Sequence, residues 1–139
     1  MIILDTNVLS ECLRPRPEPG VLAWLAAQPR ARLFTTTIVE SEIQYGIRLL
    51  PEGARKLALA EAVRAIFDED FSGRILSFDR DAAAAYASIA SSRKLAGRPI
   101  TQFDAMIAAV ACATGAILAT RNIRDFEGCG IDLVDPWMT

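Results

Sequence analysis

The chain begins with an uninterrupted apolar run from Met1 to Leu4, which is followed at once by Asp5, Thr6 and Asn7. A short apolar run of this kind is typical of a buried parallel strand, and such strands carry ligands just beyond their carboxyl ends. The Asp5 carboxylate needs a partner there, because an unpaired buried charge is costly. The chain contains no histidine. We therefore expect a hard cation held by oxygen ligands rather than a histidine-based catalytic device.

Apolar segments of strand type recur along the chain and alternate with helical patterns. We expect strands at residues 1–4, 33–37, 74–78, 116–120 and 131–134. The helical patterns cover residues 7–13, 20–28, 38–50, 54–70, 80–96 and 103–114, and Gly115 is expected to close the last of them. Strands that alternate with helices predict an α/β fold with a largely parallel sheet.

Length and composition favour one soluble domain. The 139 residues are 52% hydrophobic, which is enough for a full core. No apolar stretch approaches the roughly 20 residues of a membrane span. No basic leader precedes the first strand, so we expect a cytoplasmic protein.

The cysteines and the net charge exclude some classes of site. Cys12, Cys112 and Cys129 form no CxxC pair, so a structural zinc site is not expected. Cys112 lies in an alanine-rich apolar helix and is predicted to be buried. The net charge of −2 argues against a stand-alone nucleic-acid binder, although a local basic patch would suffice for an enzyme that acts on nucleic acid.

Glu40 and Glu42 lie on one predicted helix, two positions apart. Their side chains therefore point about 200° apart, and only one can face the edge of the sheet. We expect Glu42 to face inward, because Ile38 and Tyr45 lie near its side of the helix, and Glu40 to face solvent. The alternative is that both belong to a solvated helix face.

Asp104 has both a structural and a functional interpretation. Thr101 and Asp104 have the spacing of a helix capping box, in which the helix dipole favours the carboxylate. Almost every other side chain from Phe103 to Ala113 is apolar, however, and leaves the carboxylate few solvated directions. Asp104 is therefore a candidate site residue.

Polar residues also follow the other predicted strands. Thr120 and Asn122 lie just beyond the fourth strand, and Asp125 follows them; Asn122 and Asp125 form either a capping pair or a set of oxygen ligands. Asp79 follows the third strand and is explained by helix N-capping, which is also an alternative for Asp5.

The carboxylates matter most when they are considered together. Carboxylates held close together repel and raise one another's pKa values. A cluster without arginine or lysine among its closest members is unstable unless a cation neutralises it. Mg²⁺ or Mn²⁺ would do so with few protein carboxylates and several waters.

Four motifs in order resemble one family. They are Ile-Leu-Asp-Thr-Asn-Val-Leu-Ser at 3–10, Glu-Ile-x-x-Gly at 42–46, Phe-Asp-Ala-Met-Ile-Ala-Ala at 103–109 and Ala-Thr-Arg-Asn-x-x-Asp-Phe at 119–126. With the terminal Asp-Pro-Trp at 135–137, they resemble a PIN domain, and more narrowly the VapC-type ribonuclease toxins of type II toxin–antitoxin pairs in the FitB-like branch. The resemblance covers essentially the whole chain.

The resemblance implies a single three-layer α/β/α domain over residues 1–139 with a central, mostly parallel sheet. It implies that Asp5, Glu42 and Asp104 are catalytic carboxylates that bind Mg²⁺, or Mn²⁺ in its place. The fourth acidic position falls on Asp125, with Asn122 as an accessory ligand.

The implied activity is metal-dependent endoribonucleolytic hydrolysis of RNA. In that hypothesis Thr6, Asn7 and Thr120 position waters or substrate oxygens. Arg98 and Arg121 contact the RNA backbone, unless they are ordinary surface arginines. The implied partner is a small cognate antitoxin that binds operator DNA and inserts an inhibitory tail into the acidic pocket. The toxin is expected as a homodimer or within a toxin–antitoxin hetero-oligomer.

Two other functions remain as alternatives. One is a catalytically weak module that binds an antitoxin and acts mainly in an autoregulatory DNA-binding complex. The other is a magnesium-dependent phosphotransfer enzyme. A dehalogenase-type phosphatase needs a second aspartate where this chain has Asn7, and a response-regulator receiver needs a lysine beyond its last strands, whereas no lysine follows Lys94.

Overall fold

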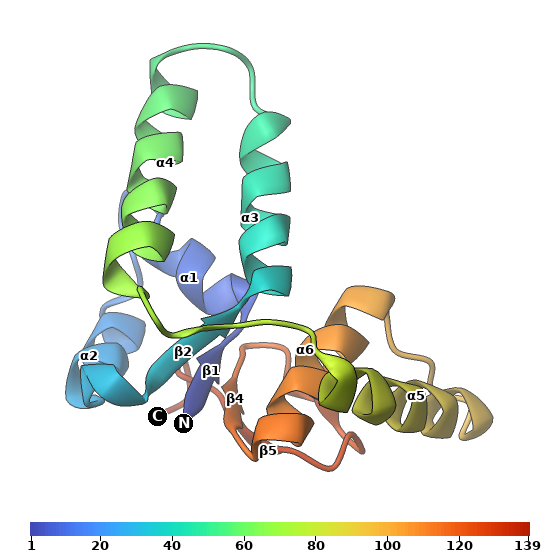
Figure 1. Cartoon of the computed structure of the whole chain (residues 1–139). Helices are drawn as coiled ribbons and strands as arrows, with labels where there is room; N and C mark the ends of the chain where they lie inside the picture. Colours follow the sequence, from blue (N-terminus) through green and yellow to red (C-terminus); the bar gives the residue numbers. More distant parts are fainter.

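A five-stranded sheet forms the centre of the computed structural model, which describes all residues from 1 to 139 (Figure 1). The strands lie in the order β3-β2-β1-β4-β5, and all four pairings are parallel. Their bounds are β1 (Ile2–Leu4), β2 (Leu33–Thr36), β3 (Ile75–Leu76), β4 (Ile117–Ala119) and β5 (Asp132–Val134). The predicted parallel five-stranded sheet is confirmed.

Helices flank this sheet and complete a three-layer α/β/α arrangement (Figure 1). The helical segments are α1 (Thr6–Cys12), α2 (Pro19–Ala27), η1 (Arg30–Arg32), α3 (Thr37–Arg48), α4 (Ala54–Ala65), η2 (Ile66–Asp70), α5 (Arg80–Leu95), α6 (Gln102–Thr114) and α7 (Ile123–Phe126). In Figure 1, α3 and α4 form a hairpin that extends away from the sheet, whereas α5 and α6 lie together on the other side of the molecule. None of the helices combines the length and apolarity that crossing a bilayer requires.

The core lies around the central strand β1. Ile2, Ile3 and Leu4 are at most 3% exposed, because β1 is flanked by β2 and β4 and covered on both faces. The run of buried residues in α6 from Ile107 to Ala111 contains three alanines, and these small side chains let the helix approach its neighbours closely. Burial of the strand on both faces explains its unbroken apolar sequence. It also places Asp5 at the middle of the carboxyl edge of the sheet.

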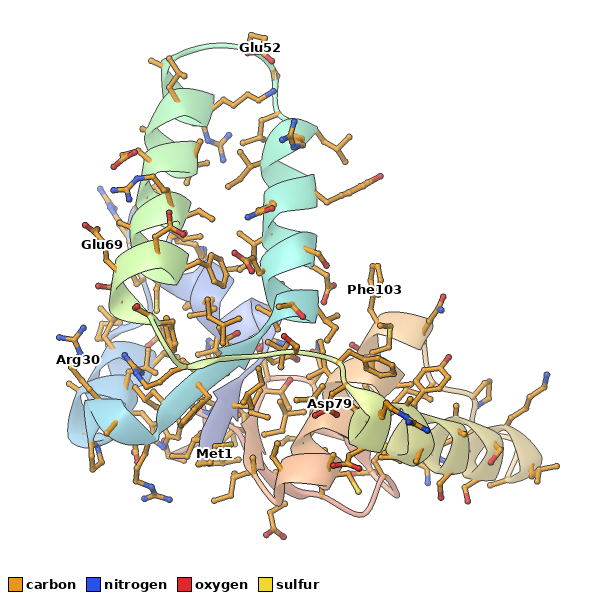
Figure 2. All side chains as sticks on the ribbon, in the orientation of Figure 1. Met1, Arg30, Glu52, Glu69, Asp79 and Phe103 are labelled. Atoms are coloured by element: carbon orange, nitrogen blue, oxygen red, sulfur yellow. The ribbon has the colours of Figure 1, made fainter.

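Side-chain caps fix where several helices begin and end. Thr36 accepts a hydrogen bond from the Val39 amide at 3.1 Å and starts α3. Asp79, which Figure 2 labels at the start of α5, accepts one from the Ala82 amide at 2.9 Å, so its predicted capping role is confirmed. Gly115 ends α6 with a φ of 68°, a left-handed conformation that glycine adopts without strain.

Three expectations need correction. The third strand was expected over 74–78 but pairs only at Ile75 and Leu76, because β3 is an edge strand whose one neighbour, β2, ends at Thr36. The helix expected over 54–70 is α-helical only to Ala65 and continues as a π-helical turn, η2, that places Phe67 in the core. Cys112 is exposed rather than buried, because the buried face of α6 ends at Ala111.

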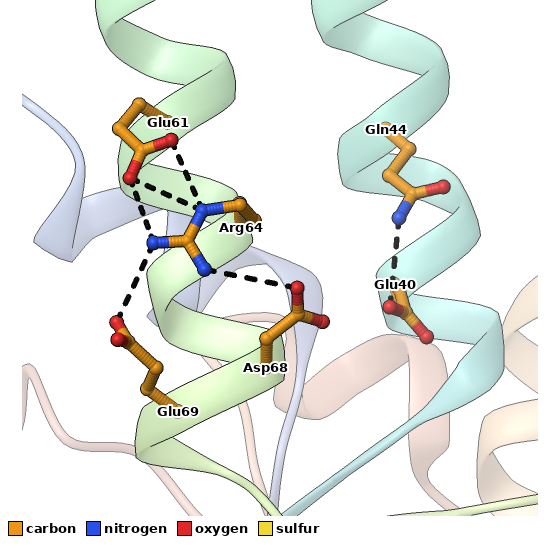
Figure 3. A network of polar contacts seen from close by, with 6 residues as sticks. All are labelled: Glu40, Gln44, Glu61, Arg64, Asp68 and Glu69. Carbon is orange, nitrogen blue, oxygen red and sulfur yellow. Dashed lines mark hydrogen bonds and ion pairs between the residues drawn. The ribbon is translucent and has the colours of Figure 1, made fainter.

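A network of polar contacts links the end of α4 to η2 (Figure 3). The Arg64 guanidinium donates two hydrogen bonds from Nε to the Glu61 carboxylate, at 3.1 and 3.0 Å, and one from Nη2 at 2.7 Å. It also lies 3.8 Å from Asp68 and 3.6 Å from Glu69. The hydrogen bonds to Glu61 and the nearby acidic charges raise the pKa of Arg64, and Arg64 in turn lowers the pKa of Glu61. All of these groups face solvent, so the network contributes little stability.

Candidate active site

Asp5 is held rigidly where β1 meets α1. Its amide donates to the Ala119 carbonyl on β4 at 3.0 Å, and its side chain is only 4% exposed. The carboxylate accepts hydrogen bonds from the Thr6 amide at 2.8 Å, the Thr120 hydroxyl at 2.8 Å and the Asn7 amide group at 3.2 Å. Asp5 therefore caps α1 and is also fixed in direction by β4.

Asn7 and Thr120 connect the ends of β1 and β4. The Asn7 side chain donates from Nδ2 to Thr120 Oγ1 at 3.2 Å and accepts at Oδ1 from the Arg121 amide at 3.1 Å. Thr120 Oγ1 also accepts from the Asn122 amide at 3.1 Å. Thr120 is fully buried. These bonds make Asn7 and Thr120 supports for the Asp5 carboxylate and for the turn after β4.

Glu42, rather than Glu40, points from α3 toward α1. Its Oε1 accepts a hydrogen bond from the Thr6 hydroxyl at 3.0 Å. Glu40 lies on another side of α3, where its carboxylate accepts a long 3.5 Å bond from the exposed Gln44 side chain. Glu40 was expected in solvent and is instead partly buried. The hydrogen bond from Thr6 thus holds the Glu42 carboxylate against the start of α1, where Thr6 directly follows Asp5.

Asp104 lies in the first turn of α6, where Thr101 is the N-cap. The Thr101 hydroxyl accepts a hydrogen bond from the Asp104 amide at 3.3 Å, as the capping-box spacing predicts. Phe103 beside it is 52% exposed and projects from the start of the helix in Figure 2. Asp104 itself is half-buried. Capping therefore uses the backbone of Asp104 and does not by itself account for the burial of its carboxylate.

Asp125 is exposed on the short helix α7 and lies near Asp104. The charge of Asp125 adds to the burial that raises the pKa of Asp104. The capping alternative for Asn122 is wrong, since its side chain forms no capping hydrogen bond at the start of α7. Asp104 and Asp125 share a small depression of about 100 Å³, lined also by Arg93, Pro99, Ile100 and Thr101. The structure thus brings two of the four predicted carboxylates to one surface feature.

Arg93 is a residue of this region that the sequence interpretation missed. It lies on α5 and is only 7% exposed. Its Nε donates to the Arg98 carbonyl at 2.7 Å, and its Nη1 donates to the carbonyls of Asp125 and Glu127 at 3.0 and 2.9 Å and to Cys129 Sγ at 3.4 Å. Arg93 therefore holds together the loop before α6 and the turn around α7. Its only sequence signal is a charged residue on a helix rich in alanine.

Burial and mutual repulsion raise the pKa values of three candidate carboxyls. Burial is the largest cause of the raised pKa of Asp5, and the Asp104 charge adds to it. Burial likewise raises the pKa of Glu42, with contributions from Asp5 and Asp104. Asp104 has a raised pKa because of burial and the charge of Asp125. No arginine or lysine lowers any of these pKa values, so the site favours positive charge.

The donor set suits a hard cation, although the carboxylates do not form one closed cage. All candidate ligands are oxygen atoms, which are the ligands that Mg²⁺ and Mn²⁺ prefer. No three acidic or cysteine side chains are placed to hold a single metal ion together. An ion bound here would therefore use one or two carboxylates and take its other ligands from water or substrate, which is the usual pattern for Mg²⁺.

A larger cavity of about 410 Å³ opens beside Glu42 between α1, α3 and α4. Its polar lining residues are Thr6, Ser10, Arg14, Glu42 and Arg55. Its remaining lining residues are Leu13, Pro15, Ile43, Gly46, Ile47, Leu50 and Leu59. The cavity thus combines apolar side chains with carboxylate and guanidinium groups in its lining.

Arg98 and Arg121, the two arginines expected near the RNA backbone, have different surroundings. Arg98 forms an exposed ion pair with Glu127 at 3.5 Å. The Arg121 guanidinium lies over the Trp137 ring, 5.0 Å from its centroid. The backbone amide of Arg121 donates a hydrogen bond to Asn7 and so connects Arg121 to the site. Arg98 is connected to the site only through the hydrogen bond that its carbonyl accepts from Arg93.

Comparison with known proteins identifies the family. A family model described as PIN domain matches residues 2–128. The chain belongs to the PIN-domain family. This PIN domain is 37% identical over 137 residues to VapC ribonuclease Y4jK of Sinorhizobium fredii, covering 99% of the chain and 98% of that relative. It is 39% identical over 137 residues to toxin FitB of Neisseria gonorrhoeae, covering 99% of each.

The fold of this PIN domain is also similar to a solved toxin–antitoxin structure. The structure of FitAB bound to an IR36 DNA fragment matches with a TM-score of 0.92 and 39% identity, covering 99% of this chain and 96% of that one. The resemblance drawn from the four sequence motifs, to PIN domains and VapC-type toxins of the FitB-like branch, is therefore confirmed.

The raised pKa values give this PIN domain a testable pH dependence. A carboxyl whose pKa is higher in the folded than in the unfolded chain destabilises the fold while it is ionised, and this penalty is relieved as the pH falls through the folded pKa. The relief is complete below the ordinary values, 3.8 for Asp5 and Asp104 and 4.5 for Glu42. Asp104→Asn is expected to stabilise the metal-free protein at neutral pH by about 0.5–1 kcal/mol.

Urea unfolding in EDTA at several pH values measures this difference. We expect the advantage of Asp104→Asn to shrink as the pH is lowered and to vanish below the ordinary aspartate value. A variant that is less stable than the wild type at neutral pH would show that the carboxylate is stabilised by partners rather than strained by burial and repulsion.

Proposed function

We propose that this PIN domain is a metal-dependent endoribonuclease toxin of a toxin–antitoxin pair. The observation that carries the proposal is the group formed by Asp5, Glu42 and Asp104, whose pKa values are raised by burial and repulsion and lowered by no basic residue. Such a group at the carboxyl edge of a parallel sheet is suited to a divalent cation. The relatives named VapC ribonuclease and toxin FitB support the choice of RNA as substrate and of toxin as role.

The proposed roles follow from how each residue is held. Asp5 and Asp104 would hold the principal Mg²⁺ or Mn²⁺, and Glu42 and Asp125 would complete the site or orient the attacking water, with Asn122 as an accessory ligand. When bound, the cation would supply water activation at neutral pH and stabilise charge on the phosphate. Thr6 holds Glu42, and Thr120 holds Asp5, through their hydroxyl hydrogen bonds. These bonds fix the direction of both carboxylates before substrate arrives.

A cognate antitoxin is the proposed protein partner. The similar structure of FitAB contains such a complex bound to DNA. The cavity between α1, α3 and α4 is lined by apolar side chains together with polar and charged ones, Glu42 among them, which suits an amphipathic segment of a partner chain. An antitoxin tail placed there would block the acidic site, and operator DNA would be bound only through the antitoxin. A homodimer or a toxin–antitoxin hetero-oligomer would follow from such pairing.

Metal addition tests the proposal directly. We expect purified antitoxin-free protein to cleave RNA with Mg²⁺ and to lose this activity in EDTA. Mg²⁺ at 100 times its dissociation constant should also stabilise the fold by about 2.7 kcal/mol, since it binds the folded chain selectively. Gel analysis of RNA fragments and thermal unfolding with and without Mg²⁺ measure the two effects. Thermal stabilisation without cleavage would favour the antitoxin-binding module over the nuclease.

A further inference from the structure

The turn after the last strand brings the end of the chain to the edge of the candidate site. The Thr120 amide donates to the Val134 carbonyl at 2.9 Å, so the residues after β5 lie beside the end of β4. The Asp135 carboxylate then accepts a hydrogen bond from the Trp137 amide at 2.9 Å, which closes a tight turn. This turn places the Trp137 ring next to Arg121, 5.0 Å from the guanidinium carbon to the ring centroid.

The backbone of Arg121 is bound to the site, and its guanidinium forms no ion pair. Its amide donates to Asn7, whose side chain also donates to the Asp5 carboxylate. Arg121 takes part in none of the ion pairs of the structure. Its charge reaches Glu11 and helps to lower that carboxyl's pKa, but the Glu11 carboxylate is already bound by the Glu18 amide and by Arg14.

The position of the Arg121 guanidinium over the Trp137 ring suits phosphate binding. A guanidinium held over the face of an aromatic ring is attracted to that face, and its N–H donors that point away from the ring stay free to bind a ligand. Those donors match the oxygens of a phosphate in a bidentate contact. The ring also limits the rotamers of a long side chain, which reduces the entropy lost when a ligand binds.

We propose that Trp137 is a positioning residue for substrate, and that it holds the Arg121 guanidinium ready to bind a backbone phosphate of single-stranded RNA next to the cleaved bond. This inference deepens the proposed nuclease function and rests on it for the identity of the substrate. Trp137 acts through Arg121 and contacts neither the metal nor the reacting atoms. The short segment after β5 thereby becomes part of the substrate-binding surface.

Binding of a fluorescein-labelled single-stranded RNA of mixed sequence, measured by anisotropy in EDTA, tests the inference. Arg121→Gln is expected to weaken binding about three- to tenfold and to reduce the slope of log affinity against log salt by about 0.7. Trp137→Leu should cause most of the same loss, whereas Trp137→Phe, which keeps an aromatic face, should retain wild-type affinity. The double variant Arg121→Gln/Trp137→Leu should bind no more weakly than Arg121→Gln alone.

Arg32→Gln is the matched control. Arg32 is an exposed arginine that precedes β2, at the opposite edge of the sheet, and its side chain forms no ion pair or hydrogen bond. Its variant should bind RNA with the wild-type affinity and salt slope. A purely structural role for Trp137 would lower thermal stability in Trp137→Leu but would not make its effect on RNA binding disappear in the Arg121→Gln background.

The outcomes separate this inference from the proposed function. Unchanged RNA binding in Arg121→Gln, or additive losses in the double variant, would overturn the role of Trp137 even if the wild type cleaves RNA. Wild-type protein that binds RNA through this pair and does not cleave it with Mg²⁺ would overturn the nuclease and leave the phosphate contact standing. Wild-type protein that binds no RNA would overturn both.

Discussion

Asp5→Asn is expected to reduce Mg²⁺-dependent RNA cleavage by about 100-fold or more, because it removes the charge of a proposed metal ligand. The side chain keeps its size, and its remaining oxygen can still accept from the Thr6 amide that it caps in the native protein. The metal-free variant should therefore fold, because relief from burying the charge offsets part of the loss of the Asn7 and Thr120 bonds to the other oxygen. Initial rates of RNA cleavage over a Mg²⁺ titration measure the loss.

Asp79→Asn provides the control for this change. Asp79 also follows a strand and caps a helix, through its bond to the Ala82 amide, but it is exposed. Asparagine caps a helix about as well as aspartate. Asp79→Asn should keep wild-type activity. If folded Asp5→Asn cleaved RNA at the wild-type rate with the same Mg²⁺ dependence, Asp5 would be a capping residue and nothing more.

Arg93→Met is expected to destabilise the fold by about 3 kcal/mol or more, because it leaves three backbone carbonyls without their donor. Those carbonyls belong to Arg98, Asp125 and Glu127. The methionine occupies a similar length of space but donates no hydrogen bond. The loss should also loosen the segments on either side of Asp104 and so weaken the affinity for Mg²⁺. Urea unfolding measures the first effect, and thermal stabilisation by Mg²⁺ measures the second.

Lys94→Met is the matched control for Arg93→Met, since Lys94 is the next residue on α5 and is exposed. Surface substitutions of this kind usually change stability by less than about 0.5 kcal/mol. We expect equal unfolding midpoints for Lys94→Met and the wild type. Equal midpoints for Arg93→Met and Lys94→Met would show that the carbonyls find other donors or water.

The apolar pattern of the sequence predicted the sheet well, because burial on both faces leaves a direct record in the residue types. Ile2 to Leu4 has no polar position, and it forms the central strand. The length of the edge strand β3 was overestimated, because Ser77 and Phe78 continue a strand-type segment while the partner strand β2 already ends at Thr36. Cys112 was placed wrongly since an alanine-rich helix has no amphipathic stripe to show which side is buried.

The candidate site was predictable in its residue types and less so in its geometry. Asp5, Glu42 and Asp104 follow strands or lie on helices whose neighbours are apolar, and that position is visible in the sequence. The sequence does not show how close the four acids lie to one another. In the structure, no three of them are placed to hold one ion together. Arg93 could not be predicted, because its partners are backbone carbonyls at 98, 125 and 127, which every residue type supplies.

That choice of partners has a consequence for how this protein can change. Every amino acid carries a main-chain oxygen, so substitutions at 98, 125 or 127 alter what faces outward without removing an acceptor for Arg93. The backbone shape of the segments at 98, 125 and 127 therefore does not depend on which side chains they carry. Libraries randomised at Arg98 and Glu127 should yield mostly folded variants, from which altered sequence preferences could be selected while the acidic centre stays as it is.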